Sequence, residues 1–285
     1  MTTTANPAEK IRQLREKTGA GMMDCKKALD EAAGDFDKAV EGLRKKGLAD
    51  AAKKSSRTTK EGLVAAYVTP DGKQGGIIEL DCETDFVAKT DEFQKAAADF
   101  AKLAAEGKLP NAEAVDAEVK GLIAKLGENM VLKRVDRFEA AGAGRIAFYV
   151  HGAGSKKGAM LELSAESEAV AKHEAVDSLA KELGMQITAM SPRWTRREEV
   201  SDAAIAKEKE IFAEQIRAEG KPEASIAKIV EGKVNKLFYQ QWVLLEQMSM
   251  RDNKTPVKDL LAQAGKAAGG AVEVKRFVRY QLGGE

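Results

Sequence analysis

Hydrophobic residues are spaced in two different ways along the chain, and the spacing changes about 60 residues from the start. In the first part, apolar residues recur every three or four positions, for example between Met22 and Ala32, which is the period of one face of a helix. Successive runs stop at glycines, and the last of them ends at Gly47. Residues 1–52 are therefore predicted to form a bundle of three short helices.

After residue 60 the period becomes extended. Two apolar runs of strand type, residues 62–68 and 76–80, flank a Thr-Pro-Asp-Gly turn signal, and an alanine-rich helical segment follows them. The same order of strand, turn, strand and helix recurs about 82 residues later, beginning at residues 144–150. These patterns predict the fold class α+β, in which a three-helix N-terminal bundle precedes a core built as an internal duplication.

The change of pattern also predicts the domain boundaries. They are a three-helix domain at 1–52, a polar linker at 53–60, and two core subdomains at 61–140 and 141–285. The second subdomain is interrupted at about 200–240 by two helical stripes around a Gly-Lys-Pro turn, which predict an inserted antiparallel helical hairpin. The chain then ends in a strand whose apolar residues would share one face: Val272, Val274, Val278, Tyr280 and Leu282.

One corner of the duplicated core differs between the copies. The first copy has Thr84-Asp85-Phe86-Val87 where the second has Ser167-Glu168-Ala169-Val170. The hydroxyl, the acid and the valine are kept in kind, as the start of a helix requires, and only the large aromatic residue is lost. The fold of this turn therefore does not need Phe86, which is either a local packing piece or an exposed wedge for a partner. Taken alone, the sequence favours packing.

The chain carries 46 basic and 45 acidic side chains, so its formal net charge is only +1. This balance argues against a chain that is basic throughout, such as a DNA-coating protein. The charge is uneven, because residues 1–60 contain 14 basic and nine acidic side chains. The bases between Arg44 and Lys60 leave open an RNA- or ribosome-binding role for that segment. No aromatic residue is interleaved there for stacking on bases, and a solvated linker is the favoured interpretation.

Few residues are available for enzyme chemistry or metal binding. His151 and His173 are the only histidines, and the sequence has no Gly-x-x-x-x-Gly-Lys-Ser/Thr phosphate loop. Cys25 and Cys82 have no metal-ligand spacing and are expected to be small buried side chains in a reducing cytoplasm. We therefore expect no catalytic residue, no cofactor and no metal site. Signal-peptide and membrane-spanning patterns are lacking in the sequence, so a cytoplasmic protein without a membrane partner is expected.

Two stretches resemble signatures of a known family. Residues 18–29 (TGAGMMDCKKAL) and 84–89 (TDFVAK) are similar to the two signatures of the translation elongation factor Ts family. Residues 126–130 (LGENM) and 149–152 (YVHG) support the resemblance, which runs from about residue 8 to the end of the chain.

The resemblance implies a guanine-nucleotide exchange factor for elongation factor Tu, with no bond-making chemistry and no direct nucleic-acid partner. It implies that the N-terminal bundle is similar to a ubiquitin-associated domain and docks on the nucleotide domain of the partner. The corner at residues 84–87 would insert into the partner and dislocate its magnesium ion. The residues expected to contact the partner are Arg15, Met22, Met23, Gly127, Asn129 and His151.

The resemblance also bears on the two ends of the second core copy. The inserted helical hairpin, a short coiled coil, would be a protein-contact arm or would form a homodimer. Some members of the family continue past the last strand into a further helix. Any contact that such a helix supplies is expected to be absent here.

Overall fold

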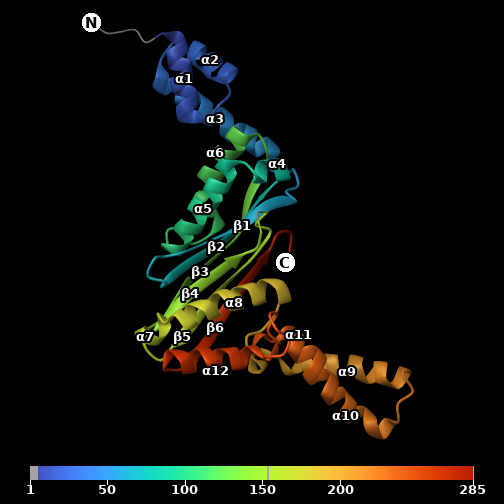
Figure 1. Cartoon of the computed structure of the whole chain (residues 1–285). Helices are drawn as coiled ribbons and strands as arrows, with labels where there is room; N and C mark the ends of the chain where they lie inside the picture. The colour runs from blue at the N-terminus through green and yellow to red at the C-terminus, as the bar shows by residue number, and fades with distance from the viewer. Residues whose placement is uncertain (1–5, 153, 285) are drawn as a thin grey trace.

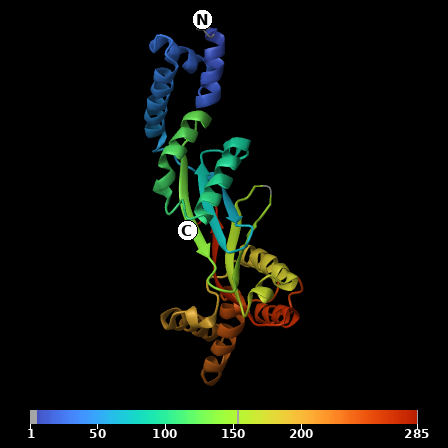
Figure 2. The same ribbon diagram turned by 90° about the vertical axis from the view of Figure 1, so that its left-hand side faces the viewer.

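The computed structural model describes residues 6–152 and 154–284. The molecule is elongated, with the N-terminal helices at one end, the sheets in the middle and a projecting pair of helices at the other end (Figures 1 and 2). Helices and antiparallel sheets occupy separate layers of the core, so the α+β class predicted from the sequence is confirmed.

The N-terminal helices form a small bundle of their own. They are α1 (Pro7–Thr18), α2 (Met22–Glu31) and α3 (Phe36–Lys54). Asp35 begins α3 by accepting a hydrogen bond from the backbone N–H of Lys38 at 3.1 Å. Leu14, Cys25 and Ala39 contribute to a shared core, in which burial of Cys25 raises the pKa of its thiol.

Gly47 does not end the third helix, and that prediction is wrong. Helix α3 continues through Gly47 to Lys54, so Lys53 and Lys54 of the predicted linker are helical. At Gly47 the helix packs against α6 (Asp116–Leu126), where a Cβ atom added to the glycine would lie 2.8 Å from the Cβ atom of Ala124. Glycine serves here for close approach of two helices rather than for a left-handed helix end.

Two antiparallel three-stranded sheets form the described part of the core. The first has the order β1 (Glu61–Val68), β2 (Gln74–Cys82) and β3 (Met130–Glu139), and the second has the order β4 (Gly144–Val150), β5 (Lys157–Ala165) and β6 (Val272–Gln281). The sheets face each other through one cluster to which every strand contributes a residue: Val64, Ile77, Phe138, Ile146, Met160 and Tyr280.

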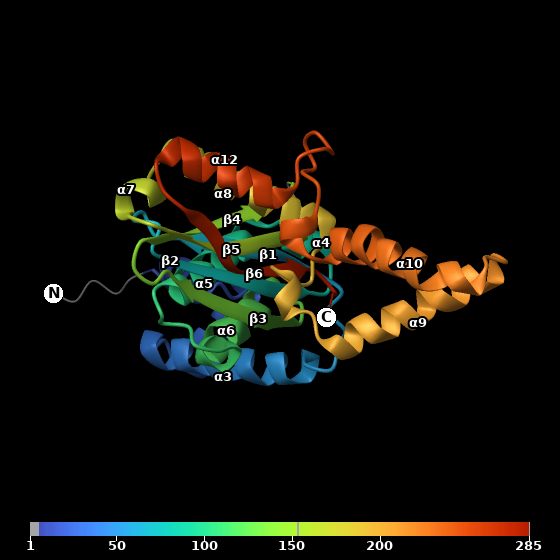
Figure 3. The ribbon, with the colours of Figure 1, turned by 90° about the horizontal axis from the view of Figure 1, so that it is seen from below.

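Helices cover the outer face of each sheet, as Figure 3 shows. Helices α5 (Asp91–Ala105) and α6 lie on the first sheet, and α8 (Glu174–Met190) and α12 (Val257–Ala268) lie on the second. Both α6 and α12 end at a left-handed glycine, Gly127 and Gly269, 142 residues apart. The duplication therefore extends to the helix and strand that complete each copy.

Each third strand contains a bulge at the equivalent position. Glu79 is opposite Arg134 while Leu80 is opposite Leu132, so Lys133 is the extra residue of β3. The same shift in the second sheet makes Lys275 the extra residue of β6. A single inserted residue reverses the side-chain alternation beyond it.

The bulge in β6 overturns the prediction that its apolar residues share one face. Val272 and Val274 pack on the side of α8 and α12. Beyond the bulge, Val278 and Tyr280 lie between the two sheets, and Leu282 follows the end of the strand.

The predicted helical hairpin is present and projects from the second copy (Figures 1 and 3). It consists of α9 (Asp202–Ala218) and α10 (Glu223–Lys233), which continues as a π-helical turn (Val234–Tyr239) into α11 (Gln240–Trp242). Phe212, Ile216 and Val230 are buried between its helices. Of the helices in residues 6–152 and 154–284, not one combines the length and the apolar character needed to span a bilayer.

Candidate partner-binding site

Phe86 lies on the surface of the molecule, on a single turn of helix. That turn, α4 (Asp85–Ala88), begins at Thr84, whose Oγ1 atom accepts a hydrogen bond from the backbone N–H of Val87 at 3.4 Å. Val87 packs against the core of the first copy, whereas Phe86 is 79% exposed. The packing interpretation of Phe86 is therefore wrong, and its exposed ring is available to a partner.

The second copy repeats the turn without the aromatic ring. Ser167 begins α7 (Glu168–Ala171) by accepting a hydrogen bond from the backbone N–H of Val170 at 3.3 Å. Val170 is buried, and Ala169, the counterpart of Phe86, is exposed. Equivalent caps, together with valines that pack on the core in both copies, show that the turn forms irrespective of the exposed side chain.

A glutamate from the junction between α6 and β3 supports the corner. The backbone N–H and the hydroxyl of Thr84 both donate to the carboxylate of Glu128, at 3.0 and 2.6 Å. The preceding residue, Glu83, accepts a hydrogen bond from the backbone N–H of Asn129 at 2.6 Å. These bonds to charged groups join two segments that are about 45 residues apart in the sequence.

Asn129 is buried, which does not fit its expected role as a contact residue. Its side chain donates to the backbone carbonyl of Arg57 at 2.7 Å and to that of Ser55 at 3.4 Å, and the residue is only 3% exposed. It therefore fastens the segment that follows α3 beneath the corner. Gly127, two residues earlier, lies on the surface with φ of +83°.

The second core copy reaches the corner through its first hairpin. A groove of about 290 Å³ is bounded by Asp85 and Lys89 on one side and by Phe148 and Lys156 on the other. Lys89 donates to Asp85 at 2.6 Å, and this hydrogen bond, together with the positive charges of Lys89 and Lys156, lowers the pKa of the Asp85 carboxyl. Asp85 therefore presents a negative charge beside Phe86 at neutral pH.

His151 is exposed in the turn of that hairpin. Its Nδ1 atom lies 2.9 Å from the hydroxyl of Tyr149, and its backbone N–H donates to the carbonyl of Lys157. It is not among the residues that line the groove.

The remaining predicted contact residues lie on the N-terminal bundle. Met22 and Met23, at the start of α2, are 59% and 75% exposed, and Arg15 is exposed on α1. The structure thus does not gather all predicted residues into one patch. It presents two apolar surfaces, one on the bundle and one at Phe86.

Nearby carboxylates partly neutralise the basic segment between Arg44 and Lys60. Lys46 pairs with Asp24 at 2.6 Å and Arg57 with Glu83 at 3.4 Å. Lys45 and Lys53 each pair with an acid on their own helix. Ion pairing of this kind weakens the case for an RNA-binding surface.

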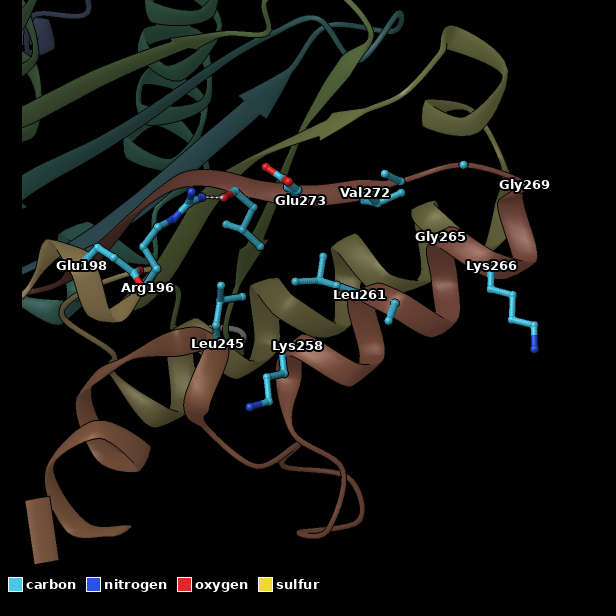
Figure 4. Close-up of a pocket in the computed structure, with 14 residues that line it drawn as sticks. Arg196, Glu198, Leu245, Lys258, Leu261, Gly265, Lys266, Gly269, Val272 and Glu273 are labelled. Carbon is cyan, nitrogen blue, oxygen red and sulfur yellow. Dashed lines mark hydrogen bonds between the residues drawn. The ribbon is translucent and has the colours of Figure 1, made fainter. Parts of the chain in front are cut away.

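A second groove lies between α12 and the start of β6 (Figure 4). Leu245, Leu261 and Val272 line this space of about 820 Å³. In the first copy, Ala51 at the end of α3 belongs to the same core cluster as Val119, the counterpart of Leu261. The structure shows no comparable helix over the second groove in the described residues.

Sequence reasoning missed Glu83 and Glu128 as parts of the site. Both lie inside or beside the stretches that carry the family resemblance, but a carboxylate on a polar surface gives no sign of what it binds. In the part of the chain that the structure describes, no group of three or more His, Cys, Asp or Glu side chains is placed to hold a metal ion.

Comparison with known proteins shows to which family the chain belongs. Curated translation elongation factors align with nearly the whole chain. An elongation factor Ts of Nitratidesulfovibrio vulgaris (strain DP4) is 45% identical over 277 residues, which cover 97% of this chain and 95% of that protein. The corresponding factor of Clostridium botulinum (strain Alaska E43 / Type E3) is 44% identical over 287 residues, covering 97% and 92%. That of Prosthecochloris aestuarii is 43% identical over 290 residues, covering 97% and 98%.

These similarities define the chain as a translation elongation factor, a component of protein biosynthesis. A family model described as elongation factor TS matches residues 83–284. The chain belongs to the elongation factor Ts family.

Proposed function

We propose that this protein acts in the cytoplasm as the guanine-nucleotide exchange factor for elongation factor Tu, with Phe86 as the residue that enters the partner. The observation that carries the proposal is the 79% exposure of Phe86 on a turn that the second copy builds equally well with Ala169. An aromatic ring that the fold does not need, held on a capped and supported turn, is suited to insertion into another protein.

Insertion of Phe86 supplies a limited amount of free energy. Burying the ring in a crevice gains ~1.5–3 kcal/mol. At about 1.4 kcal/mol per factor of ten, this lowers the affinity of the partner for GDP by roughly one to two orders of magnitude. A larger effect requires that the corner also disturb the magnesium ion, which holds the phosphates of GDP. The negative charge of Asp85 beside the ring acts in that direction by reorganising polar groups around the ion.

The exchange is reversible and needs no bond-making residue in this chain. If this factor lowers the affinity of elongation factor Tu for GDP, GDP lowers its affinity for the factor by the same ratio, because the coupling free energy between two ligands is reciprocal. An incoming nucleotide therefore releases the factor again. No cofactor takes part on the side of this protein.

Two further surfaces dock the partner around the corner. The three-helix bundle, which is similar in plan to a ubiquitin-associated domain, offers the apolar side chains of Met22 and Met23 beside Arg15 to the nucleotide domain. The exposed His151 of the second copy and Gly127 beside the corner complete the contact.

The helical hairpin is a separate contact arm. It exposes Ile211 and Leu237, which are 38% and 50% accessible, to a protein surface or to a second copy of the chain.

Release of a fluorescent GDP analogue from elongation factor Tu, followed by stopped flow over a range of factor concentrations, tests the proposal. Phe86→Ala is expected to fold normally and to lower the maximal release rate by roughly ten- to a hundredfold. Met250→Ala, which removes an exposed side chain in the second copy, is the matched control and should leave the rate unchanged. Equal rates for Phe86→Ala and the unchanged protein would refute the proposal.

A further inference from the structure

The internal duplication separates what the fold requires at the corner from what only the first copy has. Strands β3 and β6 are equivalent at a spacing of 142 residues, since each pairs with its central strand around the same bulge. Glu128 and Asn129 therefore correspond to Gly270 and Ala271. Their side chains, like the ring of Phe86, have no counterpart in the second copy.

One hydrogen bond is common to both copies. The backbone N–H of Asn129 donates to Glu83 at 2.6 Å, and the backbone N–H of Ala271 donates to Glu166 at 3.0 Å. Because the bond recurs at equivalent positions, it belongs to the architecture of the strand and the corner. The side chains of Glu128 and Asn129 make further hydrogen bonds in the first copy.

Glu128 uses both of its carboxylate oxygens on Thr84. One oxygen accepts from the backbone N–H at 3.0 Å and the other from the hydroxyl at 2.6 Å. A hydroxyl has a single proton, so donation to Glu128 leaves its lone pairs to face the backbone N–H of Val87 and begin α4. The carboxylate thereby sets the orientation of the residue that caps the turn carrying Phe86.

The second copy has no room for such a side chain. A Cβ atom added to Gly270 would lie 2.7 Å from a methyl carbon of Val170 and 3.1 Å from the carboxylate of Glu166. Ser167 makes its capping bond there, and the described residues supply it with no carboxylate partner. We call the two hydrogen bonds from Thr84 to the Glu128 carboxylate the clamp. The turn of the second copy forms without a clamp, so the clamp is not a folding requirement of the turn.

Asn129 connects the clamp to the N-terminal bundle. Its carboxamide donates to the carbonyls of Ser55 and Arg57, directly after α3, and Arg57 pairs with Glu83. A continuous set of hydrogen bonds thus leads from the end of the bundle to Thr84.

We propose that Glu128 is a positioning residue for Phe86: it holds Thr84 and so fixes the direction of the exposed ring before the partner binds, and Asn129 ties this clamp to the end of α3. The inference rests on the proposed function. A turn of four residues has little stability of its own, because helix nucleation is unfavourable. Holding the ring in its inserting orientation reduces the ordering cost of its insertion into the docked partner, which is the step that the maximal release rate reports.

A double-mutant cycle on the maximal rate of GDP release tests the positioning role. Glu128→Ala is expected to lower that rate by about tenfold, since a hydrogen bond to a charged group is lost, while the half-saturating concentration of factor changes little. In the Phe86→Ala background the same change should have almost no further effect, because there is no ring left to position. Glu128→Gln, which keeps an acceptor for Thr84, should restore part of the rate.

Two controls separate positioning from general loss of structure. Thermal unfolding of each variant reports on stability, and Ser167→Ala removes the equivalent cap in the second copy, where the rate should not change. Should Glu128→Ala itself unfold, Glu128→Gln, which removes the charge at nearly constant volume, takes its place in the cycle with a smaller expected loss.

The outcomes distinguish this inference from the function on which it rests. A normal rate for Glu128→Ala, or losses for Glu128→Ala and Phe86→Ala that multiply, would overturn the positioning role even though Phe86→Ala alone still lowers the rate. A normal rate for Phe86→Ala would instead refute the proposed function.

Discussion

Arg134 lies over the ring of Tyr280, a residue of the other core copy, with 4.3 Å between the guanidinium carbon and the ring centroid. Arg276 and Phe138 repeat this contact in the opposite direction at 4.1 Å. Each arginine also binds a carboxylate of its own sheet, Glu79 or Glu162. The two copies are thus held together by two equivalent stacks of an arginine on an aromatic ring.

The two stacks differ in burial, which gives a direct prediction. Glu79 is fully buried, while the side chains of Arg276 and Glu162 are 49% and 10% exposed. Arg134→Ala removes the hydrogen bonds that Arg134 makes to buried Glu79 and leaves Lys133, at 3.3 Å, as its remaining cation. It should lower the free energy of unfolding by about 2–3 kcal/mol. Arg276→Ala should cost about 1–2 kcal/mol, because solvent compensates part of the lost bond to Glu162. Urea unfolding of both variants would disprove this asymmetry if the two losses were equal.

The stability of the first copy should depend on the protonation of Asp81. Burial, and secondly the negative charge of Glu79, raise the pKa of Asp81 to about 7, and its Oδ1 atom has no hydrogen-bond partner in the described residues. A carboxyl whose pKa is higher in the folded than in the unfolded state destabilises the fold as the pH rises from about 4 to 7.

Replacing Asp81 with asparagine should remove this pH dependence. Asp81→Asn is expected to stabilise the protein at pH 8 by about 2–4 kcal/mol, at ~1.4 kcal/mol per pKa unit, and to have little effect at pH 4.5. The measurement is urea unfolding at both pH values. If Asp81→Asn changed the free energy of unfolding by the same amount at both pH values, the raised pKa of Asp81 would be contradicted.

Gly42 and Gly47 lie in the same helix and should respond oppositely to alanine. A methyl group added to Gly42 would meet no atom within 4 Å, so Gly42→Ala should stabilise the protein by about 0.5–1 kcal/mol through helix propensity. At Gly47 the methyl group would meet Ala124 at 2.8 Å, so Gly47→Ala should destabilise despite the same propensity. Thermal unfolding of the two variants measures both changes in stability. A gain in stability at both positions would show that α3 and α6 do not pack closely.

Docking and insertion should be separable by kinetics. Met22→Ala combined with Met23→Ala removes exposed apolar area on the bundle, and is expected to raise the half-saturating concentration of factor by roughly tenfold or more. The maximal rate of GDP release should stay the same, because docking contacts are made equally before and during release. A lower maximal rate without a change in half-saturation would mean that the methionines act in the release step itself.

Much of the architecture followed from the sequence because periodicity and duplication report on local structure. The N-terminal helices, both hairpins of the core and the projecting helical hairpin were predicted from spacing and turn residues. The bulge at Lys275 was not, since an alternating pattern carries no sign of an inserted residue. The role of Gly47 depended on a distant residue, Ala124, and so was decided by tertiary packing rather than by the local sequence.

The candidate site was predicted in part for similar reasons. Comparison of the copies isolated Phe86 but left its exposure open, and the structure places the ring in solvent. Asn129 was expected to contact the partner, and Glu128 was recognised only within a stretch of sequence, because the partner of a polar side chain is set by the fold. Their bonds to Arg57 and Thr84 became visible only with the strands in place.

Phe86 is proposed to release GDP by disturbing the magnesium site of elongation factor Tu, and removal of the ion tests this directly. The measurement compares the maximal GDP release rate of the unchanged protein and Phe86→Ala, first in excess Mg²⁺ and then in excess EDTA. We expect a difference of roughly ten- to a hundredfold with Mg²⁺ that largely disappears when the ion is removed. Equal rates in Mg²⁺, or a difference that is undiminished in EDTA, would contradict the proposed mechanism.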